Sequence, residues 1–306
     1  MKIVVTGATG LVGSALVPAL VADGHSVVRL VRKQSNAGAA GNVTDAAWQP
    51  DRGEIDTAAL AGVEAAVHLA GENISEGRWT DEKKRRIIES RARGTRLVSE
   101  TLARLTPRPR VLLSASATGY YGDRGDELLT EESSPGKNFV AEVCRAWEAA
   151  TEPARAAGIR TATLRFGIVL AREGGALVKM MTPVKLGVGG RLGSGRQFYS
   201  WITIDDAVAA IRHALEDERL SGPVNLVSPQ PVTNAEFTKA LGRALSRPTL
   251  FAVPAFAARL AFGEMADELL LASARVEPAR LKAAGFEFKH PTLDEALHHI
   301  ISDGWS

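Results

Sequence analysis

Cysteine is nearly absent from this sequence, since Cys144 is the single one among 306 residues. One thiol cannot close an internal disulfide, so a disulfide framework is excluded and a reducing, cytoplasmic setting is expected. Long apolar runs are missing too, and no stretch approaches the roughly 18 residues that cross a bilayer. The chain begins Met1-Lys2 directly before an apolar strand, which leaves no room for a signal peptide. We therefore expect neither a membrane partner nor a secreted protein.

The sequence also lacks an excess of either charge. Its 37 Lys and Arg residues against 35 Asp and Glu residues give a net charge of +2, too small to indicate a nucleic-acid partner. No histidine or cysteine spacing resembles a metal site, because the adjacent His298 and His299 would point about 100° apart on a helix. Asp205 and Asp206 are expected to cap the start of a helix. No metal is therefore predicted.

What the sequence does contain is an alternation of short β-branched runs and helical patterns. Strands are predicted at residues 3–5, 26–31, 65–69, 111–115 and 160–166. The predicted helices between them include residues 81–105 and 142–157. This alternation predicts an α/β fold, a doubly wound parallel sheet of the Rossmann type with helices on both faces.

The alternation weakens after Gly167, where seven glycines crowd residues 174–195. Beyond that point the patterns predict helices at residues 176–185, 204–216 and 234–245, with a strand at 224–227. We predict a dinucleotide-binding domain of residues 1–166 with a return segment at about 200–228. Residues 167–199 and 229–306 would form a smaller, mostly helical substrate and C-terminal lobe.

A glycine-rich turn joins the first strand to the first helix. Gly7, Gly10 and Gly13 stand at G-x-x-G-x-x-G spacing. Gly7 permits the tight turn, Gly10 lets the backbone approach a pyrophosphate, and Gly13 lets the helix pack closely on the sheet. The helix N-terminus then offers free N–H groups and its positive dipole end to the anion. Cofactor contacts are therefore predicted for Gly7, Thr9, Gly10, Leu11, Val12 and Gly13.

No acidic residue ends the second strand, where sites that prefer NAD usually place a carboxylate on the ribose 2′-hydroxyl. Here Val31 is followed by Arg32 and Lys33. The Arg32 guanidinium can bind a 2′-phosphate, although an exposed arginine without a ligand would give the same sequence. Val31 and Arg32 are therefore predicted to contact NADP(H) rather than NAD(H). An ATP site is not favoured, because the G-x-x-x-x-G-K-[ST] motif is absent.

Further motifs carry a resemblance to a known superfamily. They are Val-His-Leu-Ala-Gly at 67–71, Ser-Ala-Ser-Ala-Thr-Gly-Tyr-Tyr-Gly at 114–122, Leu-Arg-Phe-Gly-Ile-Val at 164–169 and Trp-Ile-Thr-Ile-Asp-Asp at 201–206. With the glycine turn, they make the chain resemble the extended short-chain dehydrogenase/reductases over nearly its whole length. The segments at 70–74, 78–79, 90–91, 193–195 and 283–293 resemble, more narrowly, the epimerase-family proteins also described as nucleoside-diphosphate-sugar epimerases.

The resemblance implies further contacts and a class of partner. By resemblance, Leu69, Ala70, Gly71, Arg91 and Phe166 contact the dinucleotide. The implied partner is a polar small molecule such as a nucleotide sugar, and the tail is implied to be a small helical domain. A homodimer is left open.

One departure from the superfamily concerns the chemistry. Active members carry a Tyr-x-x-x-Lys pair after the fifth strand, in which the lysine lowers the tyrosine pKa and the tyrosine exchanges a proton. Here Phe139 or Val140 falls where the tyrosine should be, and Val143 or Cys144 falls where the lysine should be. Neither register supplies the pair, and packing is the expected role of Cys144.

Three hydroxyl groups are the candidate replacements, on Ser116, Tyr120 and Tyr121. Ser116 can orient a carbonyl or satisfy local backbone, and each tyrosine can act as an acid or simply pack. Glu142 could be a base if it were buried, although a helix-surface glutamate is commoner. His68 ends a strand beside the cofactor loop and is expected to fill space.

Two functional hypotheses follow. The first is an NADP(H)-dependent, epimerase-like oxidoreductase that acts on a polar small molecule by hydride transfer. The second is a non-catalytic NADP(H)-binding sensor or regulatory protein, which the missing Tyr-x-x-x-Lys pair favours. The turn at residues 189–196, with two arginines, either closes on a substrate phosphate or is an ordinary mobile loop.

Overall fold

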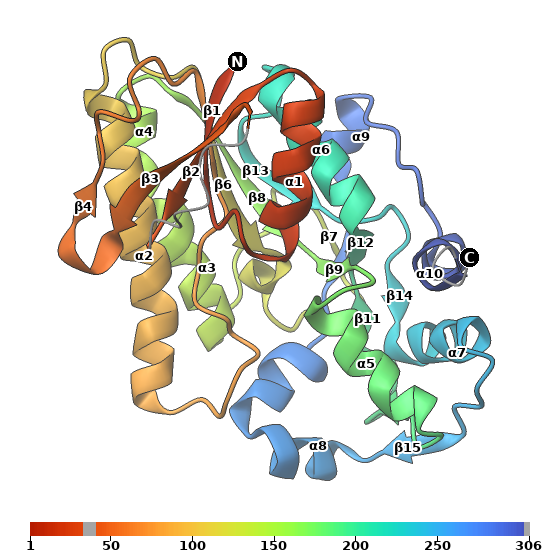
Figure 1. Cartoon of the computed structure of the whole chain (residues 1–306). Coiled ribbons are helices and arrows are strands. Elements are labelled where there is room, and N and C mark those ends of the chain that lie inside the picture. The colour runs from red at the N-terminus through yellow and green to blue at the C-terminus, as the bar shows by residue number, and fades with distance from the viewer. Residues whose placement is uncertain (33–40, 303–306) are drawn as a thin grey trace.

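One twisted sheet forms the centre of the computed structural model, which describes residues 1–32 and 41–302 (Figure 1). Its strand order is β13-β8-β6-β5-β1-β2-β3-β4. Neighbouring strands pair in parallel, apart from the antiparallel pair of β3 and β4. The bounds are β1 Lys2–Thr6, β2 Ser26–Val31, β3 Val43–Gln49, β4 Glu54–Ile55, β5 Ala65–His68, β6 Val111–Ala117, β8 Arg160–Phe166 and β13 Gly222–Leu226. The order reverses between β1 and β5, which places a topological switch point at their carboxyl ends.

Helices cover both faces of this sheet, because successive side chains of each strand point to opposite sides. Ile3 and Val5 of β1 pack with Leu16 and Ile211 in one core, whereas Val4 packs in the other. The first core lies under α1 (Leu11–Ala22) and α6 (Ile204–Glu216). The second lies under α2 (Asp81–Arg104) and α4 (Glu152–Ala156), and α3 (Phe139–Ala149) lies beside α2 (Figure 1). The predicted doubly wound α/β fold is confirmed.

Two elements of this domain differ from the expectation. The predicted helix at residues 142–157 is two helices, since α3 ends at Ala149 and α4 begins at Glu152. It also starts earlier, at Phe139, because the Asn138 side chain accepts a hydrogen bond from the Ala141 amide and caps the helix. The strand β3 was not predicted; only Ala46 and Trp48 of its seven residues are buried, so its apolar pattern is weak.

A smaller, mostly helical lobe follows the sheet, as expected. Its helices are α5 Gly175–Lys185, α7 Asn234–Ala244, α8 Ala255–Phe262, α9 Ala279–Ala283 and α10 Leu293–Ser302, with a π-helix at Ala266–Leu270. Short strands pair beside them: β9 Ile168–Leu170 with β12 Trp201–Thr203, β10 Gly190–Leu192 with β15 Phe251–Val253, β11 Phe198–Tyr199 with β14 Val232–Thr233, and β7 Leu128–Leu129 with β16 Arg275–Val276. The lobe has its own core around Leu177, Trp201, Phe237 and Leu297.

The remaining short elements are the 3-10 helices η1 (Pro50–Arg52) and η2 (Thr118–Tyr121). Part of the segment 189–196 forms the strand β10, and the Gly190 backbone in this strand lies against Phe251. No helix in the described part of the chain is long and apolar enough to cross a membrane.

Candidate functional site

The glycine-rich turn lies at the switch point, between β1 and α1. Gly7 has φ +66°, a conformation that glycine adopts without strain, and a Cβ there would lie 2.8 Å from the Leu69 carbonyl carbon. A Cβ on Gly13 would lie 2.2 Å from the Gly7 oxygen. Both positions therefore require glycine, for the close packing that the sequence predicted.

The N-terminus of α1 is open to a ligand. Gly10 is the N-cap residue, and among the described residues no side chain caps this helix and no acidic residue lies in its first turn. The first amides of a helix have no intrahelical acceptor, so those of Leu11 and Val12 can donate to an anion. Thr9 and Gly10 are exposed, and Leu11 contacts the start of α5 at Gly175.

The end of β5 is braced against this turn by Thr6. Its hydroxyl oxygen accepts hydrogen bonds from the amides of Leu69 and Ala70, at 3.1 and 3.2 Å. The same oxygen lies 2.8 Å from His68 Nδ1, so the hydroxyl proton is directed to that nitrogen. Burial lowers the pKa of His68 to about 4, which keeps its ring neutral at neutral pH. His68 thus fills space, as expected, but it bonds a side chain rather than backbone.

Positive charge gathers next to the end of β2. Val31 is half-buried, and the Arg32 side chain is exposed. Lys83 Nζ lies 2.7 Å from Glu72 Oε1. This hydrogen bond is the main cause of the lowered pKa of Glu72. Burial of the carboxyl raises that pKa, whereas the charges of Lys83, Arg86 and Arg32 lower it further. The Glu72 carboxylate is therefore in direct contact with Lys83, and the positive charges of Arg86 and Arg32 also act on it.

Arg91 of α2 is a buried cation beside Gly71. A Cβ on Gly71 would lie 3.2 Å from Arg91 Cζ, so the guanidinium lies directly under this backbone. Its side chain donates to the Ile87 carbonyl at 3.2 Å and stacks over the Trp147 ring at 4.8 Å. Within the described ranges it forms no ion pair, and burial lowers its pKa. A buried guanidinium without a carboxylate is costly, which indicates that an anion or hydroxyl-rich ligand completes it.

Phe166 is the most distant of the predicted cofactor contacts. It ends β8, which is separated from β5 by β6. It nevertheless packs against the same apolar core as Val12 and Leu69. Phe166, Val12 and Leu69 therefore lie on the side of the sheet covered by α1, whereas Ala70 and Arg91 lie on the side covered by α2.

The positions of the missing pair are filled by packing. A Cβ on Gly119 would lie 2.3 Å from Val140 Cγ1, so Val140 occupies the space against η2. One turn later Cys144 Sγ donates to the Ala117 carbonyl at 3.7 Å. Burial raises the pKa of Cys144 to about 12, so the thiol is not a ready nucleophile. A thiol also cannot supply the positive charge of the missing lysine. Val140 and Cys144 are therefore both packed inside the domain, whereas Glu142 is exposed.

Two of the three candidate hydroxyls are bonded within the protein. Ser116 is buried and donates to Glu148 Oε1 at 2.7 Å. Tyr121 is fully buried; it donates to Asn225 Oδ1 at 2.6 Å and accepts from Arg165 Nη1 at 3.0 Å. Burial, only partly offset by Arg165 and Asn225, raises the pKa of Tyr121 to about 12.

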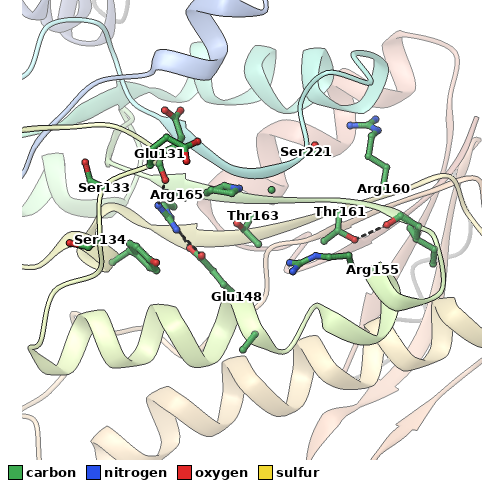
Figure 2. A pocket seen from close by; sticks show the side chains of 16 residues that line it. Glu131, Ser133, Ser134, Glu148, Arg155, Arg160, Thr161, Thr163, Arg165 and Ser221 are labelled. Atoms are coloured by element: carbon green, nitrogen blue, oxygen red, sulfur yellow. Dashed lines mark hydrogen bonds and ion pairs between the residues drawn. The ribbon is translucent and has the colours of Figure 1, made fainter.

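Tyr120 differs from these two. It is half-buried, its ring lies under the Arg165 guanidinium at 3.5 Å, and its hydroxyl makes no hydrogen bond to a described residue. It also lines an open cavity of about 720 Å³ beside β8 (Figure 2). Figure 2 shows the Arg165 guanidinium directed at the Glu148 carboxylate, with Thr163, Thr161 and Arg160 following along β8 and Arg155 reaching in from α4.

This cavity is not the dinucleotide site, since no residue of the glycine-rich turn lines it. Its walls are mostly polar or charged, with Glu131, Ser133 and Ser134 on one side. No local sequence pattern indicates this cavity, because its residues come from segments far apart in the chain.

A doubly wound sheet with an open, glycine-lined helix N-terminus at its switch point defines a Rossmann-type, nucleotide-binding class of protein. The chain belongs to the NAD dependent epimerase/dehydratase family, whose sequence profile matches residues 3–226. Residues 253–300 match a second profile, described as a domain of unknown function (DUF1731). The expected superfamily membership is confirmed.

Similar proteins span the whole chain. Epimerase family protein Mb2239 of Mycobacterium bovis is 45% identical over 98% of this chain and 97% of its own length. Human epimerase family protein SDR39U1 is 35% identical over 99% of this chain and 100% of its own. The crystal structure of human SDR39U1 isoform 2 with NADPH has a TM-score of 0.87, at 31% identity over 99% of this chain and 100% of that one.

A bacterial structure is also similar. The nucleoside-diphosphate sugar epimerase of Corynebacterium glutamicum has a TM-score of 0.81 and 38% identity, over 98% of this chain and 58% of that chain. UDP-glucose 4-epimerase of Thermotoga maritima shares the fold, with a TM-score of 0.75 at 19% identity.

Proposed function

We propose that this chain is an NADP(H)-dependent oxidoreductase of the short-chain dehydrogenase/reductase type, acting on a polar small molecule. The observation that carries the cofactor assignment is the exposed Arg32 directly after β2, a strand that no acidic residue ends. Arg91, buried beside Gly71 without an ion pair among the described residues, supplies a second cation. The NADPH bound to human SDR39U1 supports the same cofactor here.

The residues fit the cofactor on the grounds of charge and space. The α1 N-terminus and the turn from Gly7 to Gly13 would hold the pyrophosphate, and Arg32 would pair with the 2′-phosphate. Arg91 would hold the ribose from below Gly71, in the absence of the usual lysine. When bound, the nicotinamide supplies hydride chemistry. The chain's own task is then to orient the substrate and to hold a proton near it.

Tyr120 is the proposed proton donor. Of the three candidate hydroxyls, it is the one that makes no hydrogen bond to a described residue. The Arg165 guanidinium stacks over its ring at 3.5 Å and so fixes the orientation of the phenol. A nucleotide sugar is the proposed substrate class, in line with the name of the C. glutamicum relative.

A second candidate function is an NADP(H) sensor that catalyses nothing. The specific observation in its favour is that Ser116 and Tyr121 are both bonded to the Arg165–Glu148 pair, and neither is free for a substrate. The cofactor site would be the same under both hypotheses, so turnover alone separates them.

Replacing Tyr120 with phenylalanine tests the catalytic assignment. We expect turnover of NADPH with carbonyl substrates or nucleotide sugars to fall about 100-fold or more, the usual contribution of a general acid, with unchanged NADPH affinity. Tyr121→Phe is the matched control, and it should lower stability rather than chemistry, because Asn225 and Arg165 lose a buried partner. Wild-type protein that binds NADPH but turns over no substrate would favour the sensor instead.

Replacing Arg32 with glutamate tests the choice of cofactor. We expect NADPH affinity to fall about 10- to 100-fold with little change for NADH, since a charge-assisted hydrogen bond contributes roughly 1.5–3 kcal/mol. Binding is followed by the fluorescence of the reduced nicotinamide. Arg52→Glu, an exposed arginine in η1, is the control. Equal weakening for both dinucleotides would contradict the 2′-phosphate assignment.

A further inference from the structure

Two histidines and one aspartate meet where the lobe joins the sheet domain. Asp205 lies in the first turn of α6, His299 lies on α10, and His290 lies in the loop that leads to α10. One ligand atom from each lies within 4.8 Å of those from the other two. His299 Nε2 is 3.0 Å from Asp205 Oδ2, and the two imidazoles stack with centroids 4.3 Å apart.

We propose that Asp205, His290 and His299 bind a divalent transition-metal ion, Zn²⁺, which ties α10 to the start of α6. Two imidazole nitrogens and one carboxylate oxygen are ligands typical of zinc rather than of magnesium or calcium, which prefer oxygen alone. Three protein ligands leave a fourth position for water.

The geometry needs a small adjustment to hold the ion. Ligands about 2.0–2.2 Å from a tetrahedral centre lie roughly 3.3–3.6 Å from one another. The distance between Asp205 and His299 is already shorter than this. Because parallel rings direct their nitrogens in parallel, one imidazole must rotate to face the ion; all three side chains are half-buried, so they have room to do so.

The backbone around the site is held independently of any ion. Asp206 is buried, and its two carboxylate oxygens accept the amides of Lys289 and His290 at 2.8 and 3.1 Å. The expected cap is therefore corrected: Thr203 caps α6, and Asp206 anchors the His290 loop instead. These hydrogen bonds hold the His290 backbone in place before the metal binds.

The charges around the site and its position in the chain both agree with a metal ion that links α6 to α10. The positive end of the α6 dipole disfavours a cation, but Asp205 and Asp206 place two carboxylates in that first turn. Asp205 lies in the part of the chain that matches the epimerase profile, whereas His290 and His299 lie in the DUF1731 match. An ion would therefore join these two parts. Sequence spacing does not indicate the site, because His290 lies in the loop before α10 and Asp205 lies on another helix.

Zn²⁺ titration of the EDTA-treated protein tests the proposal. Calorimetry should show one saturable site, and Co²⁺ in place of Zn²⁺ should give the visible absorption of a tetrahedral centre. His290→Ala and His299→Ala should each weaken binding roughly 100-fold or more, since even an outer-shell partner contributes about 10- to 100-fold. Zn²⁺ should raise the melting temperature of the wild type but not of either variant.

His298→Ala is the matched control. This exposed side chain is the next residue on the same helix, about 100° round from His299, and its removal should leave Zn²⁺ affinity unchanged. Circular dichroism checks that each variant is folded, and Asp205→Asn gives a second, isosteric test. The proposal is wrong if the wild type shows no saturable binding, or if His298→Ala weakens binding as much as His299→Ala does.

Discussion

Replacing Glu148 with alanine should lower the free energy of unfolding by about 3–5 kcal/mol, the usual effect of removing one partner of a buried ion pair. Both Glu148 oxygens accept from Arg165, at 2.8 and 2.9 Å, and the two side chains are 15% and 3% exposed. Burial alone lowers the pKa of Arg165, but the hydrogen bonds and charge of Glu148 raise it overall. Arg165 would therefore stay charged, buried and unpaired, and Ser116 would lose its acceptor.

Urea denaturation followed by circular dichroism measures this loss. Glu152→Ala is the matched control, because Glu152 pairs with Arg155 at 3.1 Å on the surface, with both side chains more than half exposed. Exposed pairs contribute about 0–1 kcal/mol, so this variant should unfold near the wild-type midpoint. If both variants lost the same free energy of unfolding, the Glu148 partner would not be needed. The hydrogen bonds of Arg165 to Tyr121 and the Glu131 carbonyl would then be enough to stabilise its charge.

The part of the site that could be predicted is local in sequence. The turn from Gly7 to Gly13 combines a strand, a tight turn and a helix within a few residues, so its spacing alone indicates its shape. The acid-free end of β2 is equally local. The seat of a pyrophosphate and the preference for NADP(H) can therefore be argued before any tertiary contact is known.

The rest of the site depends on contacts between distant residues. Tyr121 bonds Asn225, 104 residues away, and Arg165, 44 residues away. Nothing at residues 114–122 indicates that Ser116 faces Glu148 and not a ligand, because hydroxyl groups suit both. Side-chain direction at the end of a strand is decided by what packs against it.

Packing between distant residues also decides which side chains of residues 139–144 face η2. Sequence spacing allowed either Phe139 or Val140 at the tyrosine position. In the structure Phe139 packs against Trp79, with ring centroids 5.2 Å apart, and Val140 contacts Gly119. The choice follows from the Asn138 cap, which fixes where α3 begins and so which face meets η2. The helix begins three residues earlier than predicted, so the sequence did not indicate which face of α3 meets η2.

Replacing Gly13 with alanine should weaken NADPH binding on the order of 100-fold, because an amide that no longer reaches the pyrophosphate loses a hydrogen bond to a charged group of roughly 1.5–3 kcal/mol. The new Cβ would lie 2.2 Å from the Gly7 oxygen and 2.7 Å from the Ala8 Cα. Both are backbone atoms, so the turn and the first turn of α1 must separate. That movement displaces the amides proposed to hold the pyrophosphate, whereas the sheet beneath them keeps its pairing.

Gly24→Ala is the control for this prediction. Gly24 has φ +81°, so alanine there is strained, yet a Cβ would meet nothing within 4 Å. This variant should lose about 1 kcal/mol of stability and keep its NADPH affinity. Fluorescence titration is carried out at a temperature where both variants are folded. If Gly13→Ala bound NADPH as tightly as Gly24→Ala, the turn would not be the phosphate seat, and the cations at Arg32 and Arg91 would need another explanation.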